Sequence, residues 1–236
     1  MGKITLSIFV PCFNEERNIT NTLTDIKNGV TDLNYEILVV DDASKDQTVK
    51  MIEKFKEDNP SLDIKIIRNK SNKGIGFNYR ETAQMAKGKY YMYLGGDDSL
   101  PSAEIKKTVV NIGKADMILV YFIDNRGFLR KILSKMFIII INLITINNLK
   151  YYNGSNIHLL ENVKLFCGNQ PGFGYQAELI TSQIRAKKTY LEIEVKPNLK
   201  PSEKSEALKL HSVISVTKSI TIIFLKQIVY IVRKII

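Results

Sequence analysis

Short apolar runs alternate with longer segments of mixed polarity through the first half of the chain. The short runs are nearly continuous in apolar residues, as expected for strands that are buried on both faces. The intervening segments repeat apolar residues at helical spacing. This alternation predicts parallel βαβ units with right-handed crossovers, and therefore an α/β fold with a mostly parallel sheet flanked by helices. The expected strands are residues 4–10, 36–40, 64–68, 90–94 and 117–122, and the expected helices are residues 15–27, 46–56, 77–86 and 102–112.

The second half of the chain has a different pattern. It begins with a long helical segment that is basic at its start and rich in isoleucine afterwards. A final helical segment is rich in isoleucine and valine, with lysine or arginine at regular intervals. The expected elements are a helix at 126–146, an irregular or strand-like segment at 151–160, a helix at 175–186, a strand at 190–195, a loop at 198–206 and a helix from about 208 to 236.

Composition narrows the class of partner. A hydrophobic content of 44% is enough for a buried core. The 34 Lys and Arg residues outnumber the 24 Asp and Glu residues, so the net charge of +10 favours an anionic partner such as a nucleotide, a phospholipid or a nucleic acid. We expect no nucleic-acid partner, because aromatic residues are not interleaved with basic residues on any expected strand. Two cysteines and two histidines without metal-type spacing argue against a disulfide scaffold and a zinc site.

Adjacent carboxylates follow two of the expected strands. Asp41 and Asp42 end the second strand, and Asp97 and Asp98 follow the fourth strand. Open α/β folds bind ligands at the carboxyl ends of their strands, so two acidic strand ends indicate a site for a divalent cation and a polar ligand. The alternative is that these residues cap the helices that follow, because Asp is favoured at helix N-caps.

Four motifs occur in order within residues 4–100. Taken alone, the first motif predicts that Pro11 ends a strand and that Asn14 caps the next helix. Together, the four motifs resemble those of the family two nucleotide-sugar glycosyltransferases with the GT-A fold. They are 11–16 (Pro-Cys-Phe-Asn-Glu-Glu), 41–48 (Asp-Asp-Ala-Ser-Lys-Asp-Gln-Thr), 72–76 (Asn-Lys-Gly-Ile-Gly) and 95–98 (Gly-Gly-Asp-Asp).

The resemblance implies a GT-A (Rossmann-like) core that binds a UDP- or GDP-linked sugar together with Mg²⁺ or Mn²⁺. Gly95 stands where the first Asp of the family's acidic metal motif would fall, so the resemblance leaves Asp97 as the metal ligand and Asp98 as a helper or cap. The loop 11–15 would close over the nucleotide, and Asp41 would contact its base and ribose. The resemblance assigns Pro11, Asn14, Glu15, Asp41, Asp42 and Lys73 to binding of the nucleotide sugar.

The segment after the fifth strand resembles that of the polyprenyl- and dolichyl-phosphate sugar transferases in the same family. Arg126, Arg130 and Lys131 would form an anion clamp there, because guanidinium groups bind phosphate through paired hydrogen bonds. The alternative is a solvated basic face at the start of a helix. Gln176 and Glu178 also match this subgroup, either near the site or on a helix surface. The expected catalytic residues are Asp97, Asp98, Arg126 and Arg130.

The pattern of apolar and cationic residues in the C-terminal tail predicts contact with a membrane surface. No uninterrupted apolar stretch reaches the roughly 18 residues of a spanning helix. Lys218, Lys226 and Arg233 would share one side of an amphipathic helix that lies in the bilayer interface. The alternative is that the tail packs on the rest of the domain. The expected division is a nucleotide-sugar-binding core at 1–125, an acceptor-side part of the same domain at 126–202, and a membrane-associating tail at 203–236.

These expectations describe an inverting, metal-dependent glycosyltransferase that is peripheral to the cytoplasmic face of a membrane. It would move a sugar from a nucleoside diphosphate sugar to a polyprenyl phosphate. A phosphate acceptor needs no general base, whereas a sugar hydroxyl of a growing glycan would need one, and Glu178 or Asp98 would then serve. A catalytically silent subunit that only binds a nucleotide sugar is the other alternative, and a homo-oligomer is compatible with each.

Overall fold

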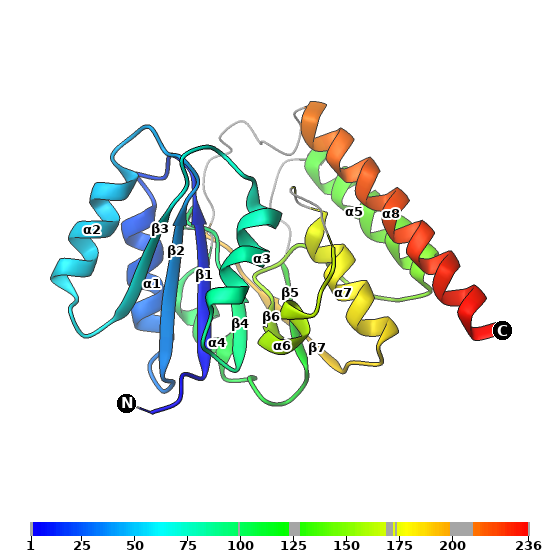
Figure 1. The fold of residues 1–236 in the computed structure, drawn as a ribbon, viewed down its shortest axis with the longest axis horizontal. Helices are drawn as coiled ribbons and strands as arrows, with labels where there is room; N and C mark the ends of the chain where they lie inside the picture. The colour runs from blue at the N-terminus through cyan, green and yellow to red at the C-terminus, as the bar shows by residue number, and fades with distance from the viewer. Residues whose placement is uncertain are drawn as a thin grey trace.

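A seven-stranded sheet forms the centre of the molecule, with helices on both of its faces (Figure 1). The computed structural model describes residues 2–98, 100–122, 128–168, 172, 174–198 and 210–235. The strands are β1 (Leu6–Cys12), β2 (Tyr35–Asp41), β3 (Asp63–Arg68), β4 (Tyr90–Tyr93), β5 (Met117–Phe122), β6 (Ile157–Leu159) and β7 (Tyr190–Val195). Their order in the sheet is β3-β2-β1-β4-β6-β5-β7, and each pairing is parallel except those of β6.

The helices cover the sheet in two layers. The described helices are α1 (Ile19–Gly29), α2 (Thr48–Asp58), α3 (Ile75–Met85), α4 (Ser102–Val109), α5 (Phe128–Thr145), α6 (Leu160–Lys164), α7 (Tyr175–Arg185) and α8 (Leu210–Ile235). Buried side chains of α1, α2 and α4 pack on one face of the sheet, and those of α3, α6 and α7 pack on the other. The long helices α5 and α8 run side by side and pack with α7 against the β5 end of the sheet (Figure 1).

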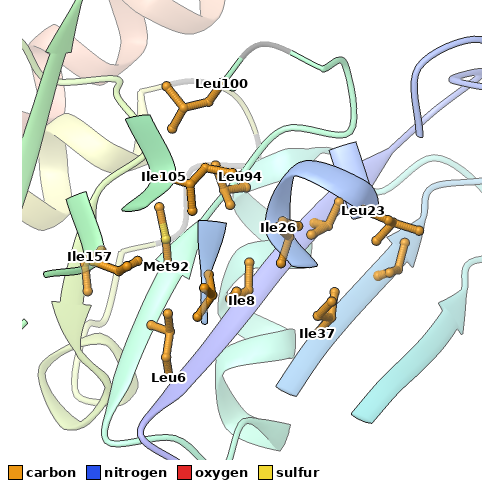
Figure 2. Packing of buried hydrophobic residues seen from close by; sticks show 14 of the residues in the cluster. Leu6, Ile8, Leu23, Ile26, Ile37, Met92, Leu94, Leu100, Ile105 and Ile157 are labelled. Atoms are coloured by element: carbon orange, nitrogen blue, oxygen red, sulfur yellow. The ribbon is translucent and has the colours of Figure 1, made fainter. Parts of the chain in front are cut away.

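The core on the α1 face follows from strand alternation. Successive side chains of a strand point to opposite faces, so every second residue of β1 faces α1. Figure 2 shows Ile8, Ile37 and Met92, from three neighbouring strands, facing Leu23 and Ile26 of α1. All five side chains are fully buried, and this packing fixes α1 relative to the tips of the strands.

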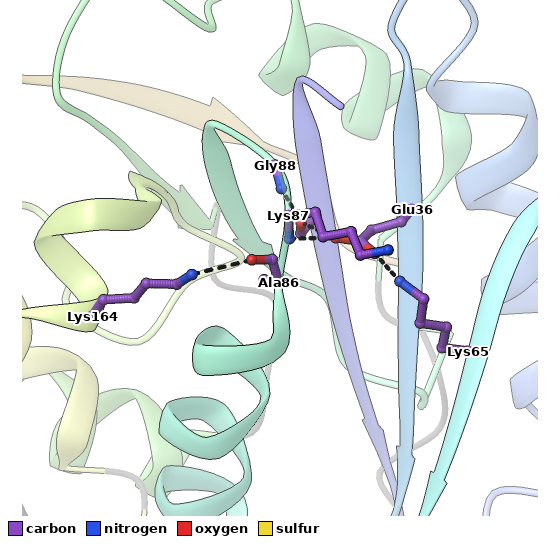
Figure 3. Close-up of polar contacts among 7 residues, drawn as sticks. Glu36, Lys65, Ala86, Lys87, Gly88 and Lys164 are labelled. Atoms are coloured by element: carbon purple, nitrogen blue, oxygen red, sulfur yellow. Dashed lines mark hydrogen bonds and ion pairs between the residues drawn. The ribbon is translucent and has the colours of Figure 1, made fainter. Parts of the chain in front are cut away.

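A buried carboxylate organises the turn that leads into β4, at the opposite edge from those tips. Glu36 accepts hydrogen bonds from the Ser7 hydroxyl at 2.7 Å and from the Lys87 backbone N–H at 2.6 Å, and it pairs with Lys65 (Figure 3). Burial raises the pKa of Glu36, but these hydrogen bonds outweigh burial and the net pKa is lowered. Gly88 completes the turn, because a Cβ there would lie 2.6 Å from the backbone N of Ser7.

The expected fold class is confirmed, with several local differences. Residues 151–160 were expected to be irregular or strand-like, and they contain β6, which pairs antiparallel with both β4 and β5. A short helix, α6, follows directly and was not expected. The first helix begins at Ile19, four residues later than expected, because residues 13–18 form a loop. None of the described helices combines the length and hydropathy needed to cross a bilayer.

Candidate active site

The carboxyl ends of β1, β2 and β4 meet at one edge of the sheet. The backbone N–H of Gly96 donates to the carbonyl of Pro11 at 3.0 Å, and that of Asp42 donates to the carbonyl of Cys12 at 2.9 Å. A Cβ on Gly96 would lie only 3.0 Å from the Pro11 carbonyl oxygen, so the segment after β4 passes close against β1. These contacts bring Asp97 to the same edge as the acidic end of β2.

The edge is electrostatically negative. Burial raises the pKa of the Cys12 thiol, and Asp41 and Glu15 raise it further. Burial likewise raises the pKa of Tyr93, and Asp97 adds to this shift. Both shifts have the direction that nearby carboxylates cause, and such a field favours binding of a cation.

Two loops at this edge are joined by hydrogen bonds. The backbone N–H of Asn14 donates to Ser44 Oγ at 2.9 Å, and that of Lys45 donates to Asn14 Oδ1 at 2.8 Å. The next amide, that of Glu15, donates to Thr48 Oγ1 at 2.7 Å. The loop between β1 and α1 is therefore held by the loop between β2 and α2.

Asn14 does not cap α1, which corrects the interpretation of the first motif taken alone. Its φ of 57° lies in the left-handed region, which Asn tolerates better than most residues. Both its backbone and its side chain are used in the bonds to Ser44 and Lys45. The N-cap of α1 is Asn18, whose side chain makes no capping bond to the helix.

The two aspartates at the end of β2 have different roles in the structure. Asp42 accepts from the Asn69 side chain at 2.7 Å and from the backbone N–H groups of Lys73 and Gly74, both at 2.9 Å. It therefore shapes the loop in front of α3. Asp41 is buried at the end of β2 and accepts from the Ser44 backbone N–H at 3.3 Å.

Asp97 lies over Gly95. A Cβ on Gly95 would be 2.7 Å from Asp97 Oδ1, so the missing side chain leaves the space in which this carboxylate lies. Within the described part of the chain, no three His, Cys, Asp or Glu side chains gather as a ready metal site. A cation that shares its ligands with a diphosphate needs only one or two carboxylates from the protein, and the exposed Asp97 fits that requirement.

Asp98 joins distant parts of the chain. Its φ is 54°, and its backbone N–H donates to Thr22 Oγ1 at 2.9 Å. Its carboxylate accepts from the side chains of Asn21 at 3.4 Å and Asn198 at 3.2 Å. These bonds tie the acidic loop to α1 and to the segment that follows β7.

The structure describes the remaining predicted residues only in part. Arg126 is outside the described residues, and Arg130 stands in the first turn of α5, where only the backbone is described. Gln176 is buried and accepts from the Asn156 side chain at 2.7 Å. Glu178 is 1% exposed and forms an ion pair with Lys226 of α8.

Residues that build the site were missed by sequence reasoning. Ser44, Asp46 and Thr48 were not assigned to the site, yet each accepts a backbone N–H from the loop after β1. The sequence feature that could have identified them is the spacing within residues 41–48, where every second residue after Asp42 has a side-chain oxygen that can accept a hydrogen bond.

The strand order, the antiparallel β6 and the acidic edge define the class of protein as an α/β protein with the GT-A fold. The structure of glucosyl-3-phosphoglycerate synthase from Mycobacterium tuberculosis, in complex with Mn²⁺, UDP and glucosyl-3-phosphoglycerate, superposes with a TM-score of 0.72 at 12% identity. The match covers 95% of this chain and 80% of that one. The family model for glycosyl transferase family 2 matches residues 7–169, and the chain belongs to that family.

Two curated relatives are similar in sequence. A dolichyl-phosphate beta-glucosyltransferase from Dictyostelium discoideum is 28% identical over 170 residues, which is 64% of this chain and 52% of the relative. A dolichol-phosphate mannosyltransferase from Pyrococcus furiosus is 31% identical over 137 residues, which is 55% of this chain and 38% of the relative. The chain thus spans about half or less of the length of these relatives.

Proposed function

We propose that this protein transfers a sugar from a UDP- or GDP-linked donor to a polyprenyl phosphate, with inversion at the anomeric carbon, as a peripheral protein on the cytoplasmic face of a membrane. The observation that carries the proposal is the meeting of Asp97 with the two linked loops at the carboxyl edge of the sheet. Membership of the family supports the donor class. The names of the two curated relatives support a lipid-linked phosphate as the acceptor.

The donor would bind across this edge. The linked loops, with Pro11, Asn14 and Glu15 on one side and Asp41 on the other, would enclose the nucleotide. Asp42 would contribute by holding the backbone of Lys73 and Gly74 in place. A divalent cation, Mg²⁺ or Mn²⁺, bound to Asp97 would neutralise charge on the departing diphosphate.

The acceptor would approach from the α5 side. Arg126 and Arg130 would hold its phosphate for attack on the sugar, since guanidinium groups bind phosphate through paired hydrogen bonds. A phosphate oxygen is already anionic, so this attack needs no general base.

The surroundings of two carboxylates favour phosphate over a sugar hydroxyl as the acceptor. Glu178 is buried against Lys226, and the carboxylate of Asp98 accepts bonds from Asn21 and Asn198. Neither arrangement suits a general base, which must reach the proton that it removes.

The proposal is tested with purified protein, radiolabelled UDP- and GDP-sugars and a polyprenyl phosphate. We expect label in an organic-extractable, acid-labile product, because a glycosyl phosphate is far more acid-sensitive than a glycoside. Arg126→Ala and Arg130→Ala should abolish most transfer, whereas Lys54→Ala, an exposed position on α2 far along the chain from both arginines, should leave it unchanged. Transfer into an acid-stable, water-soluble product would overturn the acceptor assignment. Donor binding without transfer to either class of acceptor would indicate a silent subunit.

A further inference from the structure

Helices α5 and α8 expose a large apolar surface. It is formed by Met136, Ile139 and Leu143 of α5 and by Leu225, Ile228 and Val232 of α8, which are 51%, 57%, 74%, 55%, 42% and 46% exposed. These six residues define what we call the α5–α8 face. Single exposed apolar side chains are common on soluble proteins, but so many of them on two helices in contact with each other indicate an interaction site.

The α5–α8 face is held in place by the rest of the domain. The opposite sides of both helices are buried, through Ile141 of α5 and Ile223 of α8. Lys226 forms an ion pair with Glu178 of α7, so it does not lie on a free cationic side of the tail as the sequence suggested. A Cβ on Gly174 would overlap Ser219 Oγ, which shows how closely the start of α7 approaches α8.

The charge on these helices identifies the partner. Neither α5 nor α8 contains an Asp or Glu residue. The exposed cations Lys135, Lys218, Arg233 and Lys234 lie on the same two helices. Two copies of the chain meeting through this face would bring like charges together, which opposes association. An anionic lipid surface would instead accept the apolar side chains and attract the cations around them.

We propose that the α5–α8 face is a preformed docking surface that lies in the interface of an anionic phospholipid monolayer. This deepens, and rests on, the proposed function. The helix α5 is the next described element after β5, and Figure 1 shows α5 and α8 both starting on the side of the molecule where the parallel strands end. A lipid-linked phosphate would reach the site from the same surface in which its hydrocarbon chain lies.

The chain contains no tryptophan, so an introduced one reports on its own position. Leu143→Trp and Ile228→Trp, in the full chain, should shift their emission to the blue on addition of phosphatidylglycerol–phosphatidylcholine vesicles, and brominated lipid should quench them. The matched control is Val110→Trp, because Val110 is 58% exposed but lies beyond α4. It should show neither effect. Vesicles of phosphatidylcholine alone should give a weaker response. Added salt should weaken the response to the vesicles that contain phosphatidylglycerol, because it screens their charge.

Charge substitutions test the same face without a probe. Ile139→Glu with Leu143→Glu, and separately Leu225→Glu with Ile228→Glu, should each weaken vesicle flotation at least about tenfold. Val110→Glu with Leu165→Glu, two exposed apolar positions elsewhere, should leave flotation unchanged. Circular dichroism identifies any variant that fails to fold. If the double variant of one helix does not fold, the double variant of the other helix tests the proposal.

Three results would overturn the proposal. One is flotation that is equal for wild type and face variants. Another is an emission shift at all three tryptophan positions alike. The third is wild-type protein that ignores vesicles but dimerises through this face, so that the glutamate variants become monomeric in analytical ultracentrifugation. Calorimetric binding of UDP with Mn²⁺, measured without vesicles, tests the donor site separately, so failure of the proposed function and failure of membrane docking are distinguishable.

Discussion

Thr48→Val tests whether the two loops at the carboxyl edge depend on each other. Thr48 is fully buried at the start of α2. Its hydroxyl accepts from the Glu15 backbone N–H at 2.7 Å and donates to Asp46 Oδ1. Valine has nearly the same shape but no hydroxyl, so the substitution removes both hydrogen bonds without opening a cavity.

The magnitude follows from what is left unpaired. A partly buried amide that loses its acceptor costs about 1–3 kcal/mol. The lost bond to Asp46 adds less, because the half-buried Asp46 carboxylate can regain water. A combined loss of about 2–3 kcal/mol should lower the melting temperature by about 4–12 °C in a chain of this size. If the variant's loop after β1 becomes ordered only when the nucleotide binds, the ordering free energy is taken from binding, and each 1.4 kcal/mol of it weakens affinity about tenfold.

The assays are thermal unfolding followed by circular dichroism and calorimetric titration with UDP and Mn²⁺. Thr48→Ser is the matched control, because it keeps the hydroxyl and loses only a methyl group. We expect Thr48→Val to bind UDP at least about tenfold more weakly than Thr48→Ser. Equal melting temperatures and equal affinities for the two variants would refute the idea that this hydroxyl holds the loop after β1.

Three further predictions concern other parts of the molecule. Gly95→Ala should weaken Mn²⁺-dependent UDP binding more than metal-free binding in calorimetry, because its Cβ would lie 2.7 Å from Asp97 Oδ1; equal losses would contradict this. Burial lowers the pKa of His158 to about 4, so the unfolded chain takes up the proton first as the pH falls. The free energy of unfolding, measured by urea titration, should retain the full contribution of neutral His158 above about pH 6.5 and fall by about 3 kcal/mol as the pH is lowered to 4. His158→Gln should flatten that fall. Lys226→Met should destabilise the protein by about 3 kcal/mol, because it leaves Glu178 buried without its cation, and Lys226→Met with Glu178→Gln should recover part of the loss.

The main elements of the fold were predictable because their signals are local. The parallel strands and the helices between them each have a continuous apolar run or a helical period of their own. For residues 151–160 the prediction left an irregular segment and a strand both open, because β6, Ile157–Leu159, is only three residues long and has no period to detect. Its pairing with β4 and β5 depends on partners 39 to 69 positions away. The pairing of Lys226 was missed for the same reason, since the helical period gives the angle of Lys226 around the helix but not the position of Glu178, 48 residues earlier.

The candidate site shows a related difference between finding a motif and assigning its residues. The motifs at 11–16 and 41–48 were detected as separate patterns, and ligand contacts were expected from several of their members. In the structure, Asn14 and Ser44 bind each other's loops, and Asp42 binds the loop before α3. An amide in the first motif needs an acceptor, and the second motif contains that acceptor. The loops of the two motifs are therefore joined by hydrogen bonds in the structure, so a ligand role for any one of their residues requires a test beyond the presence of the motif.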